Sequence, residues 1–121
     1  MQGGPFNIHK RDQEVYLTVG IYGIRVLGGW GVRIHDFSIM LKKKGADIIV
    51  EPKKTILRIQ SFEFNKRAKK IMVLDVPKSG KYHIEFKNPK SLEVRRSNLF
   101  ITRLLFGDDK LPNESLEICI C

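Results

Sequence analysis

Alanine, the strongest helix former, is almost missing from this chain of 121 residues: there are only two, Ala46 and Ala68. Residues that favour strands are plentiful instead, with fourteen isoleucines, eight valines, three threonines and eleven aromatic residues. Such side chains pack well on the pleated surface of a sheet. The composition therefore argues against a helical bundle, and the ordinary apolar content of 42% argues against intrinsic disorder.

Cysteine is equally scarce, since the chain has only Cys119 and Cys121. A disulfide framework links distant parts of a chain, which two neighbouring cysteines cannot do. The sequence also lacks any apolar run of about 18 residues, the length that a transmembrane helix needs, and its first residues lack a signal-peptide pattern. We therefore expect a cytoplasmic protein with free thiols and no transmembrane segment. An exported protein whose signal peptide had been removed would present the same sequence.

Apolar and polar residues alternate in short runs that are separated by turn residues, most clearly over residues 82–87. The side chains predicted to face the core there are Tyr82, Ile84 and Phe86, and those predicted to face solvent are His83, Glu85 and Lys87. About nine or ten such runs occur, and no credible helix interrupts them. The pattern predicts an all-β fold, an antiparallel β-sandwich with jelly-roll-like connections, in which residues 1–121 form a single domain.

The turns between these runs are short, which favours pairing between strands that follow one another in the sequence, as in a meander. We expect residues 28–31 to form a hairpin-like turn and residues 65–70 to form a basic connection between two strands. Residues 98–106 are a longer apolar run, which predicts a further strand. The last run, residues 115–121, predicts a strand that closes a sheet edge.

One of these runs resembles a known family. Residues 76–88 read Val-Pro-Lys-Ser-Gly-Lys-Tyr-His-Ile-Glu-Phe-Lys-Asn and are similar to the Gly-x-Tyr-x-apolar-x-Phe-x-Asn strand of GOLD domains. The similarity extends over about residues 76–100, where Ser91 and Arg95-Arg96 stand for the serine and the basic residue that follow in the family. GOLD domains are small β-sandwiches taken to be protein-interaction modules, so the resemblance implies a sandwich and an interaction role. The paired cysteines, coiled coil and membrane span that accompany the domain in cargo receptors are missing.

The sequence contains no motif of a known catalytic or metal site. Its three histidines are far apart: His9, His35 and His83. His35 and Asp36 would form an acid–base pair only at a bulge, because adjacent strand residues point to opposite faces. Cys119 and Cys121, on one face of a terminal strand, are either small packed hydrophobes or an incomplete ligand pair for a soft metal. We therefore expect no enzyme activity, no metal and no cofactor.

Positive charge is abundant, because lysine and arginine number 22 and aspartate and glutamate 13, a net charge of +9. Much of this charge lies in three predicted turns, at residues 42–44, 53–54 and 66–70. In a meander the first and third of these turns would lie at the same end of the sheet. The candidate anion-binding residues in those two turns are Lys42, Lys43, Lys44, Lys66, Arg67, Lys69 and Lys70. The second turn, with Lys53 and Lys54, would lie at the other end. Such a patch would attract nucleic acid, anionic lipid or an acidic protein, although lysines at turns also keep sheet edges soluble.

The glycine-rich stretch 28–31 carries the only tryptophan, Trp30, which is the candidate residue of a ligand-binding loop. An aromatic side chain at a loop tip stacks on a sugar or a base, whereas in the other interpretation it folds back on the sandwich. Without catalytic motifs, these features predict a non-catalytic binding or interaction module whose partner is another protein. The alternative is a protein that binds nucleic acid or an anionic surface through the basic segment from Lys42 to Lys70. Aromatic residues do not alternate with the basic ones there, as they do in single-strand binders.

Overall fold

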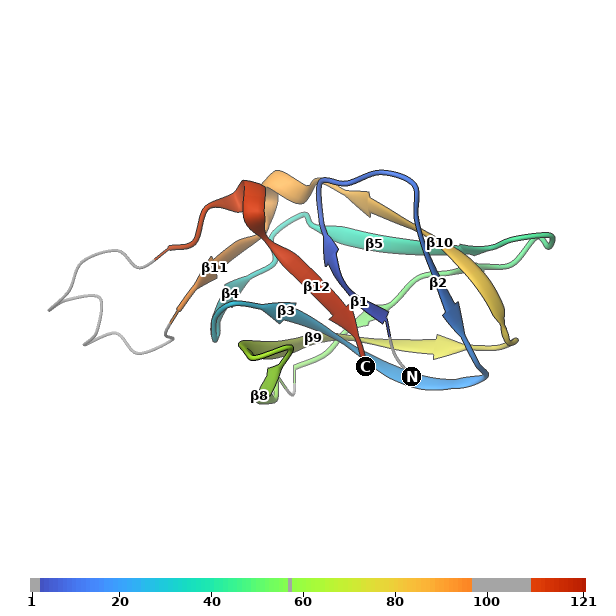
Figure 1. The fold of residues 1–121 in the computed structure, drawn as a ribbon, viewed down its shortest axis with the longest axis horizontal. Coiled ribbons are helices and arrows are strands. Elements are labelled where there is room, and N and C mark those ends of the chain that lie inside the picture. Colours follow the sequence, from blue (N-terminus) through green and yellow to red (C-terminus); the bar gives the residue numbers. More distant parts are fainter. Residues whose placement is uncertain (1–2, 57, 97–109) are drawn as a thin grey trace, which may run out of the picture.

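The structure is a computed structural model that describes residues 3–56, 58–96 and 110–121 (Figure 1). Within these residues the chain forms twelve strands, two short 3-10 helices and no α-helix, so the all-β prediction is confirmed. The strands are β1 (Gly3–Asn7), β2 (Gln13–Leu17), β3 (Gly20–Leu27), β4 (Gly31–Arg33), β5 (Ser38–Lys43), β6 (Ile49–Val50), β7 (Lys53–Lys54), β8 (Gln60–Glu63), β9 (Lys66–Val76), β10 (Gly80–Lys87), β11 (Glu93–Arg95) and β12 (Glu117–Ile120). The 3-10 helices are η1 (Pro89–Ser91) and η2 (Asn113–Ser115). The predicted strand at 98–106 lies outside the described residues.

The strands form two large antiparallel sheets and a small one. The first sheet has the order β1-β12-β3-β9-β7, and β8 pairs with β9 along the same edge as β7. The second sheet has the order β2-β10-β5-β6, and the third joins β11 to β4. One hydrophobic core draws buried side chains from both large sheets, for example Leu74 and Ile118 from the first and Leu41 and Ile84 from the second. The fold is therefore a sandwich of antiparallel sheets, and the jelly-roll connectivity stays a prediction.

The prediction that strands neighbouring in sequence pair with one another is wrong for most of the chain. Among the described strands, only β5 with β6 and β8 with β9 pair in this way. Other short connections change sheet: residues 77–79 lead from β9 in the first sheet to β10 in the second, and residues 18–19 lead from β2 to β3. A chain that passes between the two layers at its turns pairs its strands with distant partners, so a short turn does not identify a hairpin.

Strand β10 follows the predicted alternation. Tyr82 and Ile84 are buried, and Phe86 is half-buried and stacks on Phe37 with the ring centroids 6.1 Å apart. The residues of the opposite face are half-buried or exposed: His83, Glu85 and Lys87. Strand β10 thus lies between β2 and β5 with one face on the core.

The last strand, β12, is an interior strand of the first sheet and not the edge strand that the sequence predicts. It lies between β1 and β3 (Figure 1). Leu116, Ile118 and Ile120 are all buried in the core. An apolar strand of this kind loses the most water-exposed surface when it has a neighbour on each side, which explains its central position.

The opposite face of the first sheet carries a second, smaller core. Leu27, Ala68 and Cys119 are buried there, and Cys121 packs against them. The two cysteines lie on one face, as predicted, and both are free thiols with their Sγ atoms 3.1 Å apart. Burial among these apolar groups raises the pKa of the Cys119 thiol, so the thiol form is favoured.

Candidate functional site

Strands β8 and β9 form a tight hairpin whose turn is Phe64-Asn65. Both turn residues have positive φ angles, 51° and 60°, and Glu63 lies opposite Lys66 across the turn. This is the geometry of a two-residue type I′ turn. The basic residues that follow therefore begin the long strand β9, and the prediction of a basic connection at 65–70 is wrong.

The side chain of Trp30 packs against this hairpin. The guanidinium of Arg67 lies 4.6 Å from the centre of the indole, and the ring of Phe62 meets the indole edge-on with the centroids 5.4 Å apart. The indole N–H donates a hydrogen bond to the carbonyl oxygen of Ser61 at 3.3 Å. Phe62 and Arg67 are directly opposite each other in the ladder, so both side chains project on the face where Trp30 lies. Trp30 does fold back, but it remains half-buried beside an aromatic and a cationic side chain.

The loop that carries Trp30 is fixed by backbone contacts rather than by a hairpin. The N–H of Gly28 donates to the carbonyl of Arg67 at 2.6 Å, and the N–H of Trp30 donates to the carbonyl of Arg96 at 3.4 Å. A Cβ at Gly29 would meet the carbonyl oxygen of Arg95, so only glycine fits this close approach. Strand β3 pairs with β9 and β12, whereas β4 pairs with β11. The predicted hairpin at 28–31 is therefore wrong. The glycines instead allow the backbone of this loop to approach the backbone of Arg95 closely.

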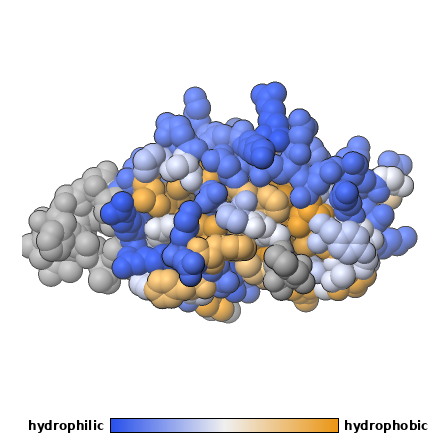
Figure 2. Space-filling view, viewed as in Figure 1, coloured by the Kyte–Doolittle hydropathy of each residue, from blue (hydrophilic) through white to orange (hydrophobic). Residues whose placement is uncertain are grey.

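Large apolar side chains are exposed along the same hairpin and the segment before it. The exposed fractions are 97% for Ile56, 53% for Ile59, 67% for Phe62 and 43% for Phe64. We call these four residues, together with Trp30, the β8 surface; Phe62 and Trp30 share one face of the hairpin, and Ile59 lies on the other. Figure 2 shows hydrophobic side chains gathered at the lower left, where β8 lies in Figure 1, next to strongly hydrophilic ones. A monomeric protein rarely gathers exposed apolar side chains in this way unless they bind something.

Three cations border the β8 surface. Arg67 and Lys69 are two residues apart on β9 and so share a face. Arg58 donates from Nη1 to the carbonyl of Val32 at 3.1 Å. Burial, and to a smaller extent the positive charge of Arg58, lower the pKa of Lys69. Within the described part of the chain, no acidic side chain forms an ion pair with any of these three cations, so no described carboxylate neutralises their charge.

The other predicted basic cluster lies elsewhere. Lys42 and Lys43 end β5, and Lys44 begins the turn to β6, at the end of the molecule opposite to β8 (Figure 1). Lys44 forms a 2.8 Å ion pair with Glu14, and this hydrogen-bonded contact lowers the pKa of the glutamate. The seven candidate residues therefore do not form one patch. The expectation is wrong because it places the Lys66 cluster in a meander turn rather than in a strand.

The remaining basic residues of the prediction are also separated. Lys66 forms a 2.8 Å ion pair with Glu117 on the outer face of the first sheet, and the alkyl chain of Lys70 lies beside Gly23. Lys53 and Lys54 form β7, which pairs with β9 on the same edge as β8. Of the seven predicted residues, only Arg67 and Lys69 thus border the β8 surface.

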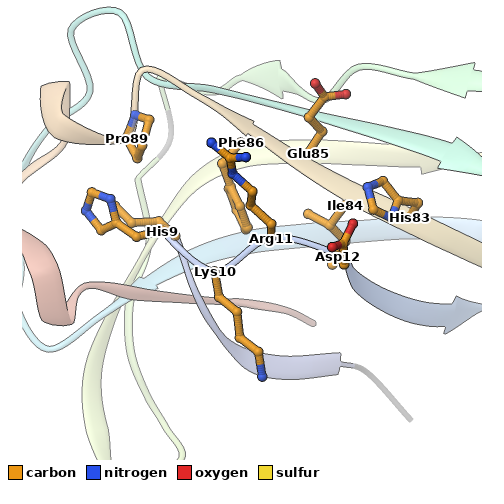
Figure 3. A pocket seen from close by; sticks show the side chains of 10 residues that line it. His9, Lys10, Arg11, Asp12, His83, Ile84, Glu85, Phe86 and Pro89 are labelled. Atoms are coloured by element: carbon orange, nitrogen blue, oxygen red, sulfur yellow. The ribbon is translucent and has the colours of Figure 1, made fainter.

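The histidines do not assemble into an acid–base site. An open cavity of about 610 Å³ lies between the loop after β1 and strand β10. Figure 3 shows His9 and His83 at opposite ends of it. His9 Nε2 bonds Asn113 Oδ1 at 2.7 Å, away from His83. His35 Nε2 bonds Glu93 at 2.7 Å, and among the described contacts His35 has no bond to Asp36. No group of three or more metal-ligating side chains is found among the residues that the structure describes.

Comparison with family models, with curated proteins and with solved structures finds no match to this chain. The resemblance to GOLD domains accordingly stays a prediction. Within the described residues no helix is long and apolar enough to cross a membrane.

The sequence gives Trp30 and Arg67 as separate candidates but misses Arg58 and the apolar members of the β8 surface. The alternation of apolar and polar residues shifts by one position in this segment, but its apolar residues still resemble core residues. No local feature of the sequence indicates that they are exposed. The contact between Trp30 and Arg67 depends on pairing across 37 positions of the chain, which periodicity does not reveal.

Proposed function

We propose that the protein is a non-catalytic binding module that takes another protein on the β8 surface. The observation that carries this proposal is the exposure of four large apolar side chains within residues 56–64. Aromatic and branched apolar side chains that lose water on binding are the usual anchors of protein interfaces. Trp30 contacts Phe62 and donates a hydrogen bond to Ser61 on one side of the hairpin. These contacts hold Phe62 in place in the unbound protein, which lowers the entropy cost of binding.

A crosslinking experiment tests this proposal. A photoreactive phenylalanine analogue at position 62 should form an adduct with a protein partner in an extract of the source cells. Replacing Ile59 and Phe64 by serine should abolish the adduct, because two of the four exposed apolar side chains are lost. The matched control carries Tyr16→Ser and Ile21→Ser, which alter side chains that are also exposed, at 61% and 75%, outside this surface. Equal loss of the adduct in both variants would contradict the proposal.

A second candidate function is the binding of single-stranded nucleic acid on the same surface. Arg67 lies over the indole of Trp30, and Phe62 meets that indole edge-on. Arg58 and Lys69 add positive charge without an acidic partner among the described residues. Such a group stacks on a base and holds a phosphate. Since Trp30 is the only tryptophan, its fluorescence reports directly on stacking. Quenching by oligouridylate that weakens steeply with salt would favour this function, and unchanged fluorescence at low salt would exclude it.

A further inference from the structure

The ladder between β8 and β9 determines which backbone groups of β8 remain free. The N–H of Lys70 donates to the carbonyl of Ile59 at 3.0 Å, so Ile59 and every second residue after it direct their backbone groups toward β9. Gln60 and Phe62 fall between these residues, and their N–H and C=O groups point away from β9. Within the described residues, no other strand lies on that side. Strand β8 thus presents an open hydrogen-bonding edge.

Strand β8 also lacks the devices that protect other sheet edges. Strand β1, at the far edge of the first sheet, carries Pro5 and a register shift between Gly3 and Phe6. The second sheet has two edge strands: β6 has only two residues, and β2 carries the charged Glu14, which pairs with Lys44. In contrast, β8 carries the exposed Phe62 in a regular ladder with β9. An edge strand with free backbone groups is a template for pairing with another chain.

We propose that the protein partner binds as an extended strand along the open edge of β8, and that this strand carries acidic residues at alternate positions. The inference rests on the proposed function, because it concerns the same surface and the same class of partner. The free backbone groups of Gln60 and Phe62 would supply main-chain hydrogen bonds, which fix the added strand. Phe62 and Trp30 would contact every second side chain of that strand, since side chains on one face of a sheet are neighbours.

Charge complementarity selects an acidic partner over a second copy of this chain. Arg58, Arg67 and Lys69 border one face of the hairpin without an acidic partner among the described residues. Two copies pairing through β8 would bring these cations together, and the net charge of +9 would add to the repulsion. On the other face, Lys66 is already paired with Glu117. Acidic residues are therefore expected on one face of the added strand, which gives the alternate spacing.

Selection from a phage-displayed library of random dodecapeptides tests the inference on the full chain. We expect the enriched peptides to carry Asp or Glu at alternate positions. The best peptide is then measured against Gln60→Pro, which removes an outward N–H without touching the β8–β9 ladder, and against the matched control Gln60→Ala, which keeps it. We expect at least a tenfold loss of affinity for Gln60→Pro and less than a twofold loss for Gln60→Ala.

A change in the peptide makes the test independent of the folding of any variant. N-methylation of alternate backbone amides of the selected peptide blocks one hydrogen-bonding edge and leaves its charge unchanged. One of the two alternate sets should abolish binding to the unaltered protein. If Phe62→Ser weakens binding but neither set nor Gln60→Pro does, strand addition is wrong and the proposed function stands. If no peptide is enriched, both the strand addition and the proposed protein-binding function are wrong, whether or not oligouridylate binds.

Discussion

The Lys42–Lys44 and Lys66–Lys70 regions look alike in the sequence and differ in nearly every structural respect. The first ends a strand and enters a turn at one end of the molecule, where Lys44 is neutralised by Glu14. The second opens the longest strand, and its Arg67 lies on the indole of Trp30. A run of basic residues therefore does not specify its own environment. The contacts brought by distant segments decide whether the charge is solvated or held against aromatic rings.

The largest expected difference between the two regions is the loss of unfolding free energy when a glycine beside each region is replaced by alanine. Gly29→Ala places a methyl group on the carbonyl of Arg95, so it should lower the free energy of unfolding by about 3 kcal/mol. Gly45→Ala, in the Lys42–Lys44 turn, meets no neighbour within 4 Å but has a φ of +76°, so it should cost only about 1 kcal/mol. Urea unfolding of both variants measures the difference. Equal losses would mean that the Trp30 loop is not held by its approach to Arg95.

The next effect concerns the aromatic contact itself. Trp30→Ala removes the indole from between Arg67 and Phe62 and breaks the hydrogen bond to Ser61, so it should cost about 2 kcal/mol of unfolding free energy. Lys42→Ala, an exposed change in the other region, should stay within about 0.5 kcal/mol. Thermal and urea unfolding decide the matter. A Trp30→Ala variant as stable as the unaltered protein would show that the hairpin does not depend on this contact.

A smaller effect on the unfolding free energy shows whether Arg67 acts through its planar guanidinium group or only through its positive charge. Arg67→Lys keeps the positive charge but loses the planar group over the indole and the hydrogen bond to the carbonyl of Arg96, and it should cost about 1 kcal/mol. The reverse exchange in the other region, Lys42→Arg, should change the unfolding free energy by less than about 0.3 kcal/mol. Denaturant midpoints compare the two. Similar values for both exchanges would reduce the role of Arg67 to its charge.

The subtlest difference is in the response to pH. Lys44 lowers the pKa of Glu14, so this contact stabilises the fold above the acidic range and is lost as the pH falls through that lowered pKa. Burial and Arg58 lower the pKa of Lys69, so stability is regained as the pH rises from that lowered pKa toward the ordinary lysine value. NMR titration should find that Lys44→Ala raises the pKa of Glu14. Arg58→Ala should raise the pKa of Lys69 only in part, because burial remains; full recovery would contradict the order of causes.

Much of the fold is predictable because local alternation is strong where one face of a strand lies on the core. Tyr82 and Ile84 follow this rule, and so do the last apolar residues of the chain. The turn at Phe64-Asn65 escapes prediction because a phenylalanine in a left-handed conformation is unusual there, so the basic residues after it resemble the connection. Strand pairing escapes prediction because turns that change sheet look like turns that reverse within one sheet.

The candidate site is predictable only in pieces. Trp30 and Arg67 stand out individually, one as the single tryptophan and the other within a basic run. Their contact depends on where Gly29 passes Arg95, a long-range feature that no local pattern records. Exposure of Phe62 is equally invisible, because a phenylalanine in an alternating run is ordinarily a core residue.

The central position of β12 imposes an order in time on biosynthesis. Among the described strands β1 pairs only with β12, which is translated more than a hundred residues later. At about 5–20 residues per second, β1 waits on the order of ten seconds on the ribosome without its partner. During that interval the edge of β3 that later pairs with β12 is also unpaired. Chaperones bind unpaired apolar strands of this kind. The first sheet is completed only after β12 has been translated, so its assembly depends on contacts between distant parts of the chain.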